Sequence, residues 1–180
     1  FMMSLLLIGA MMVAQFNSFY QALLILSAVL VSTVGVLLGH MLFQQPFSIV
    51  LSGLGVVALA GIVVNNNIVL IDTFNVLRRD FPELSMTELS IRTGAQRLRP
   101  VFLTTITTGL GLIPLAIGLS VDLFERYTTT HGMVASFWKP LACTLVYGLT
   151  FSTILTLVIT PMLMVLPYRL RNWWQARGRV

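Results

Sequence analysis

The stretch FSIVLSGLGVVALAGIVVNNNIVLI, residues 47–71, decides the fold of this chain. It carries no charged side chain, and it is longer than the about 20 apolar residues that an α-helix needs to cross the hydrocarbon core of a bilayer. Three further apolar runs, at residues 20–43, 101–119 and 141–166, are also uncharged and long enough to cross that core. The sequence therefore predicts an all-α polytopic membrane protein.

The composition of the whole chain excludes several other classes of protein. Of its 180 residues, 57% are hydrophobic and only 9% are charged, whereas about 25% of the residues of soluble domains are charged. The net charge of +5 comes from 11 basic residues that are diluted into apolar sequence and form no nucleic-acid-binding face. A disordered chain, a nucleic-acid module and an ordinary cytosolic enzyme are therefore excluded, and the single Cys143 gives no disulfide framework.

The first apolar run, residues 1–16, is too short to span a bilayer and lacks the features of a signal peptide. We therefore expect a fragment that begins inside its first helix, making five transmembrane helices in all. The expected segments are a truncated transmembrane helix at 1–16, transmembrane helices at 20–43, 47–77, 100–119 and 140–167, a cytoplasmic amphipathic helix at 83–98, a periplasmic loop at 120–139 and a basic cytoplasmic tail at 168–180.

Basic residues predict the orientation of these helices. Nine of the 11 lie in the 72–100 linker or in the C-terminal tail, two segments that are separated by two helices. The positive-inside rule places both segments, and with them the C-terminus, in the cytoplasm. Within the linker, Ser85 and Glu88 fit a capping box, and apolar residues then recur at helical spacing, which predicts the short amphipathic helix along the membrane surface.

Small residues predict where the helices pack closely. Gly35 and Gly39 form a G-x-x-x-G pattern, and Thr144, Gly148 and Ser152 repeat the four-residue spacing in the last helix. Lipid provides no hydrophobic drive for helix association, so close backbone approach at such residues is expected to hold the bundle together.

Three consecutive asparagines, Asn65, Asn66 and Asn67, need polar partners inside the membrane. Successive residues of a helix point about 100° apart, so no single neighbouring helix can serve all three. Two interpretations of Asn65 and Asn66 stay open: hydrogen bonds between helices, or a hydrated functional path. For Asp72, near the cytoplasmic end of the same helix, we expect an exposed or capping role.

The following helix carries threonines, of which Thr104 and Thr108 share one face. A hydroxyl stripe facing the asparagines predicts a polar seam, although a threonine can also bond its own i−4 carbonyl and be harmless in lipid. His40 and His131 stand alone, and no catalytic or metal-binding motif is present in the sequence. We therefore expect no enzyme activity, no metal site and no cofactor.

Several blocks of sequence follow one another in a fixed order. They are VAQFNSF (13–19), QPFS (45–48), the 61–72 segment, RLRP (97–100), TT (104–105), GLIPLA (111–116) and FWKPL (137–141). Together they resemble the C-terminal membrane portion of a resistance-nodulation-division (RND) efflux permease. The resemblance covers essentially the whole chain and matches its five helices to the eighth to twelfth of a twelve-helix protomer.

The resemblance implies a homotrimeric antiporter of the bacterial inner membrane that exchanges protons for hydrophobic or amphiphilic compounds. Its partners would be the N-terminal remainder of the same protomer, a periplasmic adaptor, an outer-membrane channel and the lipid bilayer, with no nucleic acid. Two alternatives stay open: an RND-superfamily component for lipid or protein export, and a membrane scaffold that transports nothing.

The resemblance also suggests which residues take part in a proton relay. In drug-efflux members, a lysine on the tenth helix pairs with intramembrane aspartates, and the matching position here is Asn65. A threonine of the eleventh helix matches Thr104, and an arginine before that helix matches Arg97. Because asparagine cannot neutralise a carboxylate, a lysine-dependent relay does not carry over unchanged. The candidates for the relay and polar seam are Asn65, Asn66, Thr104, Arg97 and Asp72.

Overall fold

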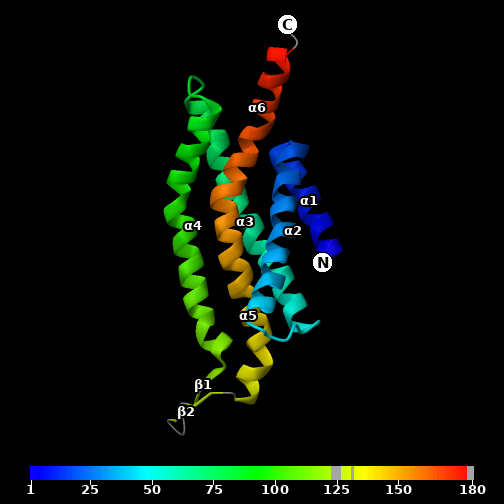
Figure 1. The fold of residues 1–180 in the computed structure, drawn as a ribbon, viewed down its shortest axis with the longest axis vertical. Helices are drawn as coiled ribbons and strands as arrows, with labels where there is room; N and C mark the ends of the chain where they lie inside the picture. The colour runs from blue at the N-terminus through cyan, green and yellow to red at the C-terminus, as the bar shows by residue number, and fades with distance from the viewer. Residues whose placement is uncertain (123–126, 131, 178–180) are drawn as a thin grey trace.

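The computed structural model describes residues 1–122, 127–130 and 132–177. Its elements, in chain order, are α1 (Met2–Phe16), α2 (Phe19–Leu42), α3 (Leu51–Asp80), α4 (Met86–Ile117), strands β1 (Leu119–Asp122) and β2 (Tyr127–Thr130), α5 (Met133–Ile154), the π-helical turn η1 (Leu155–Ile159) and α6 (Thr160–Arg177). The two strands pair antiparallel. Because α5, η1 and α6 follow one another without a break, they form one long rod (Figure 1).

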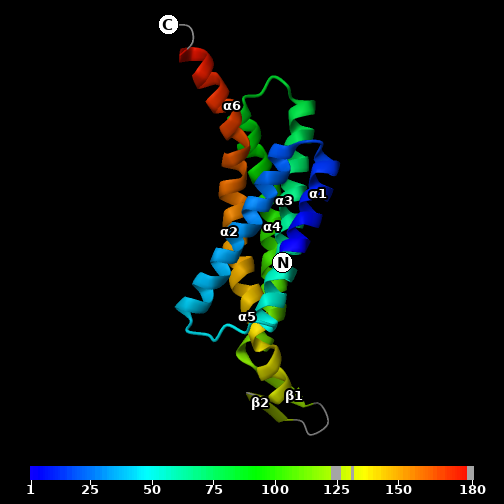
Figure 2. The same ribbon diagram turned by 90° about the vertical axis from the view of Figure 1, so that its right-hand side faces the viewer.

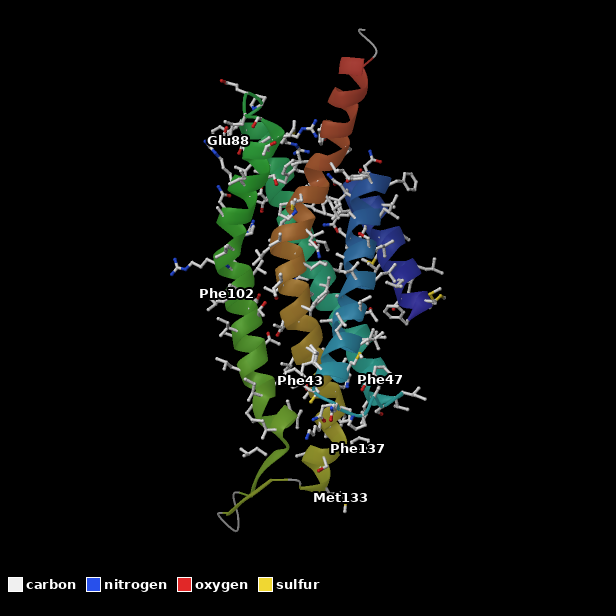
Figure 3. The ribbon with its side chains drawn as sticks, in the orientation of Figure 1. Phe43, Phe47, Glu88, Phe102, Met133 and Phe137 are labelled. Carbon is white, nitrogen blue, oxygen red and sulfur yellow. The ribbon has the colours of Figure 1, made fainter. Side chains whose placement is uncertain are left out.

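The helices form an elongated bundle. In Figure 1, α4 lies at one edge and α1 at the other, with the α5–α6 rod, α3 and α2 between them. The strands lie at one end of the bundle, called here the hairpin end, and the end of α6 and the α3–α4 turn lie at the other, called here the tail end (Figures 1 and 2). Figure 3 places Glu88 at the tail end and Met133 and Phe137 at the hairpin end.

The predicted fold class is confirmed. Four helical segments are long and apolar enough to cross a membrane: Phe19–Leu42, Leu51–Asp80, Met86–Ile117 and Met133–Tyr168. The fifth, Met2–Phe16, is apolar but shorter. The fully buried apolar residues come mainly from α2 and α3, which pack against α5, as Val36, Leu59 and Val63 illustrate.

Close packing of α2, α3 and α5 occurs at small residues. A Cβ atom added to Gly35 would lie 2.3 Å from Cδ1 of Phe151, and one added to Gly39 would lie 2.4 Å from Cβ of Tyr147. A Cβ atom on Gly148 would lie 2.2 Å from Cδ2 of Leu59. Thr144 and Ser152, the other members of the predicted packing set, are buried in the same interface. These glycines allow helix backbones to approach where no side chain would fit.

The structure differs from the sequence-based boundaries at α4. No separate amphipathic helix exists over 83–98, because α4 begins at Met86 and continues through Pro100 to Ile117. The buried Leu89 and Thr93 pack its first turns onto the bundle instead of leaving them on a membrane surface. Pro100 is exposed and costs the helix one backbone hydrogen bond as well as crowding at the carbonyl four residues before it, a local penalty that the packing of the first turns outweighs.

Two further boundaries differ in the last third of the chain. The predicted 120–139 loop contains most of β1, all of β2 and the start of α5, which begins at Met133 and encloses Pro140. The last helix continues to Arg177, well beyond the predicted end at residue 167. Parts of the predicted loop (123–126 and 131, which includes His131) and the last tail residues, 178–180, lie outside the described residues.

Candidate polar site between α3 and α4

The three asparagines of α3 point in three directions, as the helical phase predicts. Asn65 is exposed, whereas Asn66 is only 9% exposed and Asn67 is fully buried. The helix itself therefore distributes the amides, because each residue turns the next side chain by about 100°. Only Asn65 and Asn66 face the space between α3 and α4.

This space is a groove of about 450 Å³. From α3 it is lined by Ala58, Gly61, Ile62, Asn65 and Asn66, from α4 by Thr104 and Thr108, and from α5 by Leu149. Ala58 and Gly61 contribute little or no side chain, which leaves room between the helices. The structure thus brings together three of the sequence-predicted site residues, namely Asn65, Asn66 and Thr104.

The groove offers hydrogen-bond donors and acceptors, but no charged residue in the described ranges lines it. Thr104 donates its hydroxyl proton to the carbonyl of Val101 at 2.9 Å, which leaves its oxygen lone pairs able to accept a hydrogen bond. An asparagine amide offers two donors and an acceptor. In the described part of the chain, no hydrogen bond joins Asn65 to Thr104 across the groove. The arrangement can therefore hold water or hydrogen-bond a carboxylate.

Arg97 and Asp72 lie outside the groove, about two helical turns from it toward the tail end. Arg97 on α4 is half-buried and donates from Nε to the hydroxyl of Thr73 on α3. Asp72, the neighbour of Thr73, is exposed. Among the described residues these two charged side chains form no ion pair, since the salt bridge found there joins Arg92 to Glu88. Arg97 therefore acts here as a link between α3 and α4.

The α4 wall of the groove is largely uncovered. Only 6% of the α4 span is buried, against 50% to 56% of the other three spans. Phe102, midway along α4, is 52% exposed and lies at the outer edge of the bundle (Figure 3). The groove and the apolar face of α4 are therefore open to whatever lies beside this chain.

Sequence reasoning missed a second set of polar contacts, which join α3 and α4 to the α5–α6 rod. Asn67 bonds Thr156 and Thr160 of the last helix, and Thr105 on α4 bonds Thr153. A signal for this set is present in the sequence, because Thr153, Thr156 and Thr160 recur at spacings of three and four and so share one helical face.

The model of the AcrB/AcrD/AcrF family matches residues 1–167. The chain belongs to this family. The resemblance to RND efflux permeases is thereby confirmed, and the chain is part of a multi-pass membrane protein of the AcrB/AcrD/AcrF type.

Individual members of the family are similar over most of this chain. The multidrug resistance protein MdtC of Proteus mirabilis (strain HI4320) is 33% identical over 162 residues, which are 90% of this chain. The cobalt-zinc-cadmium resistance protein CzcA of Cupriavidus metallidurans is 31% identical over 167 residues, or 92% of this chain. A crystal structure of a heavy metal efflux pump superposes with a TM-score of 0.72 at 33% identity and covers 90% of this chain. The chain spans 14% of the length of each of these proteins.

Proposed function

We propose that the full-length protein is a proton-driven exporter and that this chain supplies the polar wall beside its proton-carrying groups. The observation that carries this proposal is the gathering of Asn65, Asn66, Thr104 and Thr108 in one groove within membrane-spanning helices. Polar side chains at such depth are costly unless they serve a pathway or find partners. The family membership supports export as the activity.

The partner of the groove is the N-terminal remainder of the same protomer. The open groove and the uncovered face of α4 are a surface against which further transmembrane helices pack. Carboxylates on those helices would receive hydrogen bonds from the Asn65 amide and from waters held by Thr104. Such hydrogen bonds stabilise the ionised carboxylate less than the positive charge of a neighbouring lysine would. A carboxylate beside Asn65 would therefore take up a proton more easily than one beside a lysine. Asn65 thus orients the carboxylate as the lysine would, but it does not neutralise the negative charge of that carboxylate.

The same membership supports the assembly that we propose. The protein is a homotrimer of the bacterial inner membrane that works with a periplasmic adaptor and an outer-membrane channel. We propose that the tail end of the bundle is cytoplasmic, because five arginines lie in the ends of α3 and α4 beside the turn that joins them, and that the hairpin end is periplasmic. Transport without covalent chemistry is its activity, so we propose no enzyme function.

Two substrate classes are supported by named relatives. Hydrophobic or amphiphilic compounds are the first candidate, because MdtC is a multidrug resistance protein. Divalent metal cations are the second, because CzcA is a cobalt-zinc-cadmium resistance protein. A growth assay distinguishes the two substrate classes. A host that lacks its own exporters expresses the full-length protein and is challenged either with dyes and detergents or with cobalt, zinc and cadmium salts, and the set of compounds to which it becomes resistant identifies the class.

Substitutions in the groove test the proposed mechanism. Asn65→Ala and Thr104→Ala in the full-length protein are expected to lower proton-coupled transport about tenfold at equal expression, which corresponds to ~1.4 kcal/mol. Thr107→Ala is the matched control, because Thr107 is exposed, lies outside the groove and bonds only carbonyls of its own helix. Transport at the wild-type rate by both groove variants would refute the mechanism. Absence of proton flux in the intact protein would favour a scaffold that transports nothing, and flux driven only by lipids or proteins would favour the other export role.

A further inference from the structure

The last membrane helix contains the π-helical turn η1, which ends two residues before Pro161. At the end of this turn, the N–H group of Thr160 donates to the carbonyl of Leu155, five residues back. In regular α-helical geometry the ring of Pro161 would collide with the carbonyl of Leu157, and that carbonyl would lose its donor. The wider turn relieves the collision. Such turns inside α-helices occur frequently at functional sites.

Helix α3 is hydrogen-bonded to this turn through Asn67, whose side chain is fully buried. Its Nδ2 donates to Oγ1 of Thr156 at 3.4 Å, and its Oδ1 accepts from Oγ1 of Thr160 at 2.9 Å. Nδ2 also donates to the carbonyl of Val63 at 2.9 Å, which fixes the plane of the amide. Both ends of the Asn67 amide are therefore engaged by the turn.

Helix α4 is hydrogen-bonded to the same part of the last helix. Oγ of Ser90 donates to the carbonyl of Pro161 at 3.0 Å in a buried contact. Closer to the groove, the hydroxyls of Thr105 and Thr153 lie 2.7 Å apart. The π-turn is thus bracketed by polar contacts from both helices that form the walls of the groove.

These anchors adjoin the groove residues in sequence. Asn65 lies two residues before Asn67, and Thr104 lies next to Thr105. We propose that η1 sets the separation of the α3 and α4 walls, with Asn67 and Thr105 as positioning residues for Asn65 and Thr104. The functional importance of this arrangement rests on the function proposed above, but the separation of the walls is measurable independently of transport.

Spin labels on α3 and α4 of the full-length protein measure this separation. Gly53→Cys and Gly109→Cys provide attachment points, because a Cβ atom added at either glycine meets no other atom within 4 Å. The tested variant is Thr156→Val with Thr160→Val, which removes both hydroxyls and preserves the shape of the side chains. Its matched form, Thr156→Ser with Thr160→Ser, keeps the hydroxyls. Thr150→Val is the control, since its exposed hydroxyl bonds only the carbonyl of Val146.

The expected result is a distance distribution that shifts or broadens beyond its wild-type width in the double valine variant. The serine pair and Thr150→Val are expected to keep the wild-type distribution. Transport per folded molecule should fall about tenfold in the valine variant, equivalent to ~1.4 kcal/mol, because the Asn67 amide keeps only its bond to the Val63 carbonyl of its own helix and no longer links α3 to the turn. An unchanged distribution in the folded valine variant would overturn the inference.

Two further variants keep the test decisive. If the valine pair fails to fold, Ser90→Ala takes its place, because it removes one hydrogen bond on the opposite side of the turn. This variant is expected to shift the same distance distribution by a smaller amount, and an unchanged distribution would overturn the inference. Asn65→Ala separates this inference from the proposed function. Normal transport by both Asn65→Ala and Thr104→Ala, alongside a shifted distribution in the valine variant, rejects the proposed role of the groove and supports the positioning role of η1.

Discussion

Replacing Gly35 by alanine should destabilise the bundle at a single interface. The added Cβ atom would lie 2.3 Å from Cδ1 and Cγ of Phe151 and 2.5 Å from its Cβ. Rotation of the phenylalanine ring cannot relieve the last contact, because the Cβ atom moves only with the backbone. Helices α2 and α5 must therefore separate by about 1 Å, and a gap of that size forfeits a quarter to a half of the dispersion energy of the affected contacts.

The net cost follows from two opposing effects. Overpacking of this kind typically costs 1–3 kcal/mol, so we take about 2 kcal/mol. The higher helix propensity of alanine returns up to about 1 kcal/mol. We therefore expect Gly35→Ala to lower the free energy of unfolding of the purified full-length protein by about 1 kcal/mol or more, measured by denaturant titration in mixed micelles. Gly53→Ala is the control, because its Cβ atom would enter open space. Equal stability of the two variants would refute the reasoning.

Three further predictions concern other contacts of the bundle. Thr144→Val should lower the free energy of unfolding by about 1–3 kcal/mol, because it leaves Nε2 of the buried His40 without its 2.9 Å partner, and Thr144→Ser should restore it; equal stability of the valine and serine variants would contradict this. Cysteines at Gln21 and Asn75, whose amides lie 3.1 Å apart, should crosslink with a short bifunctional reagent, whereas pairing position 21 with position 76 should not. Ser85→Ala should cost about 1 kcal/mol and speed hydrogen exchange in the first turn of α4 but not in its centre, since the Ser85 hydroxyl accepts from the Glu88 N–H at 3.2 Å; unchanged exchange there would contradict the capping role.

Features that depend only on residues close together in the sequence were predictable without the structure. The prediction of a helix at 20–43 differs by only one residue at each end from the observed Phe19–Leu42. Ser85 caps α4 as expected, but the Glu88 side chain does not complete the capping box, because it pairs with Arg92 at 2.9 Å instead. Local patterns such as apolar runs and caps determine where a helix begins because they act within one or two turns.

Proline positions misled the same reasoning. The helices expected at 100–119 and 140–167 begin at Pro100 and Pro140, yet both prolines lie inside longer helices. The missing hydrogen bond at a proline is a local penalty, whereas burial of Leu89 in α4 and Ala135 in α5 is a gain that depends on partner helices. Whether the gain from burial exceeds the proline penalty depends on the packed arrangement of the helices, which the sequence does not give. The same holds for the π-turn before Pro161, which sequence reasoning did not predict.

The sequence by itself determined the membrane class, the spans and the angular positions of the three asparagines, because hydropathy and helical phase are properties of a single segment. Only the tertiary structure decided which partner each amide meets. Asn65 faces Thr104 across an open groove, whereas Asn67 bonds Thr160, a residue 93 positions further along the chain. Such pairings depend on how separate helices cross, and in this bundle glycines such as Gly148 set that approach.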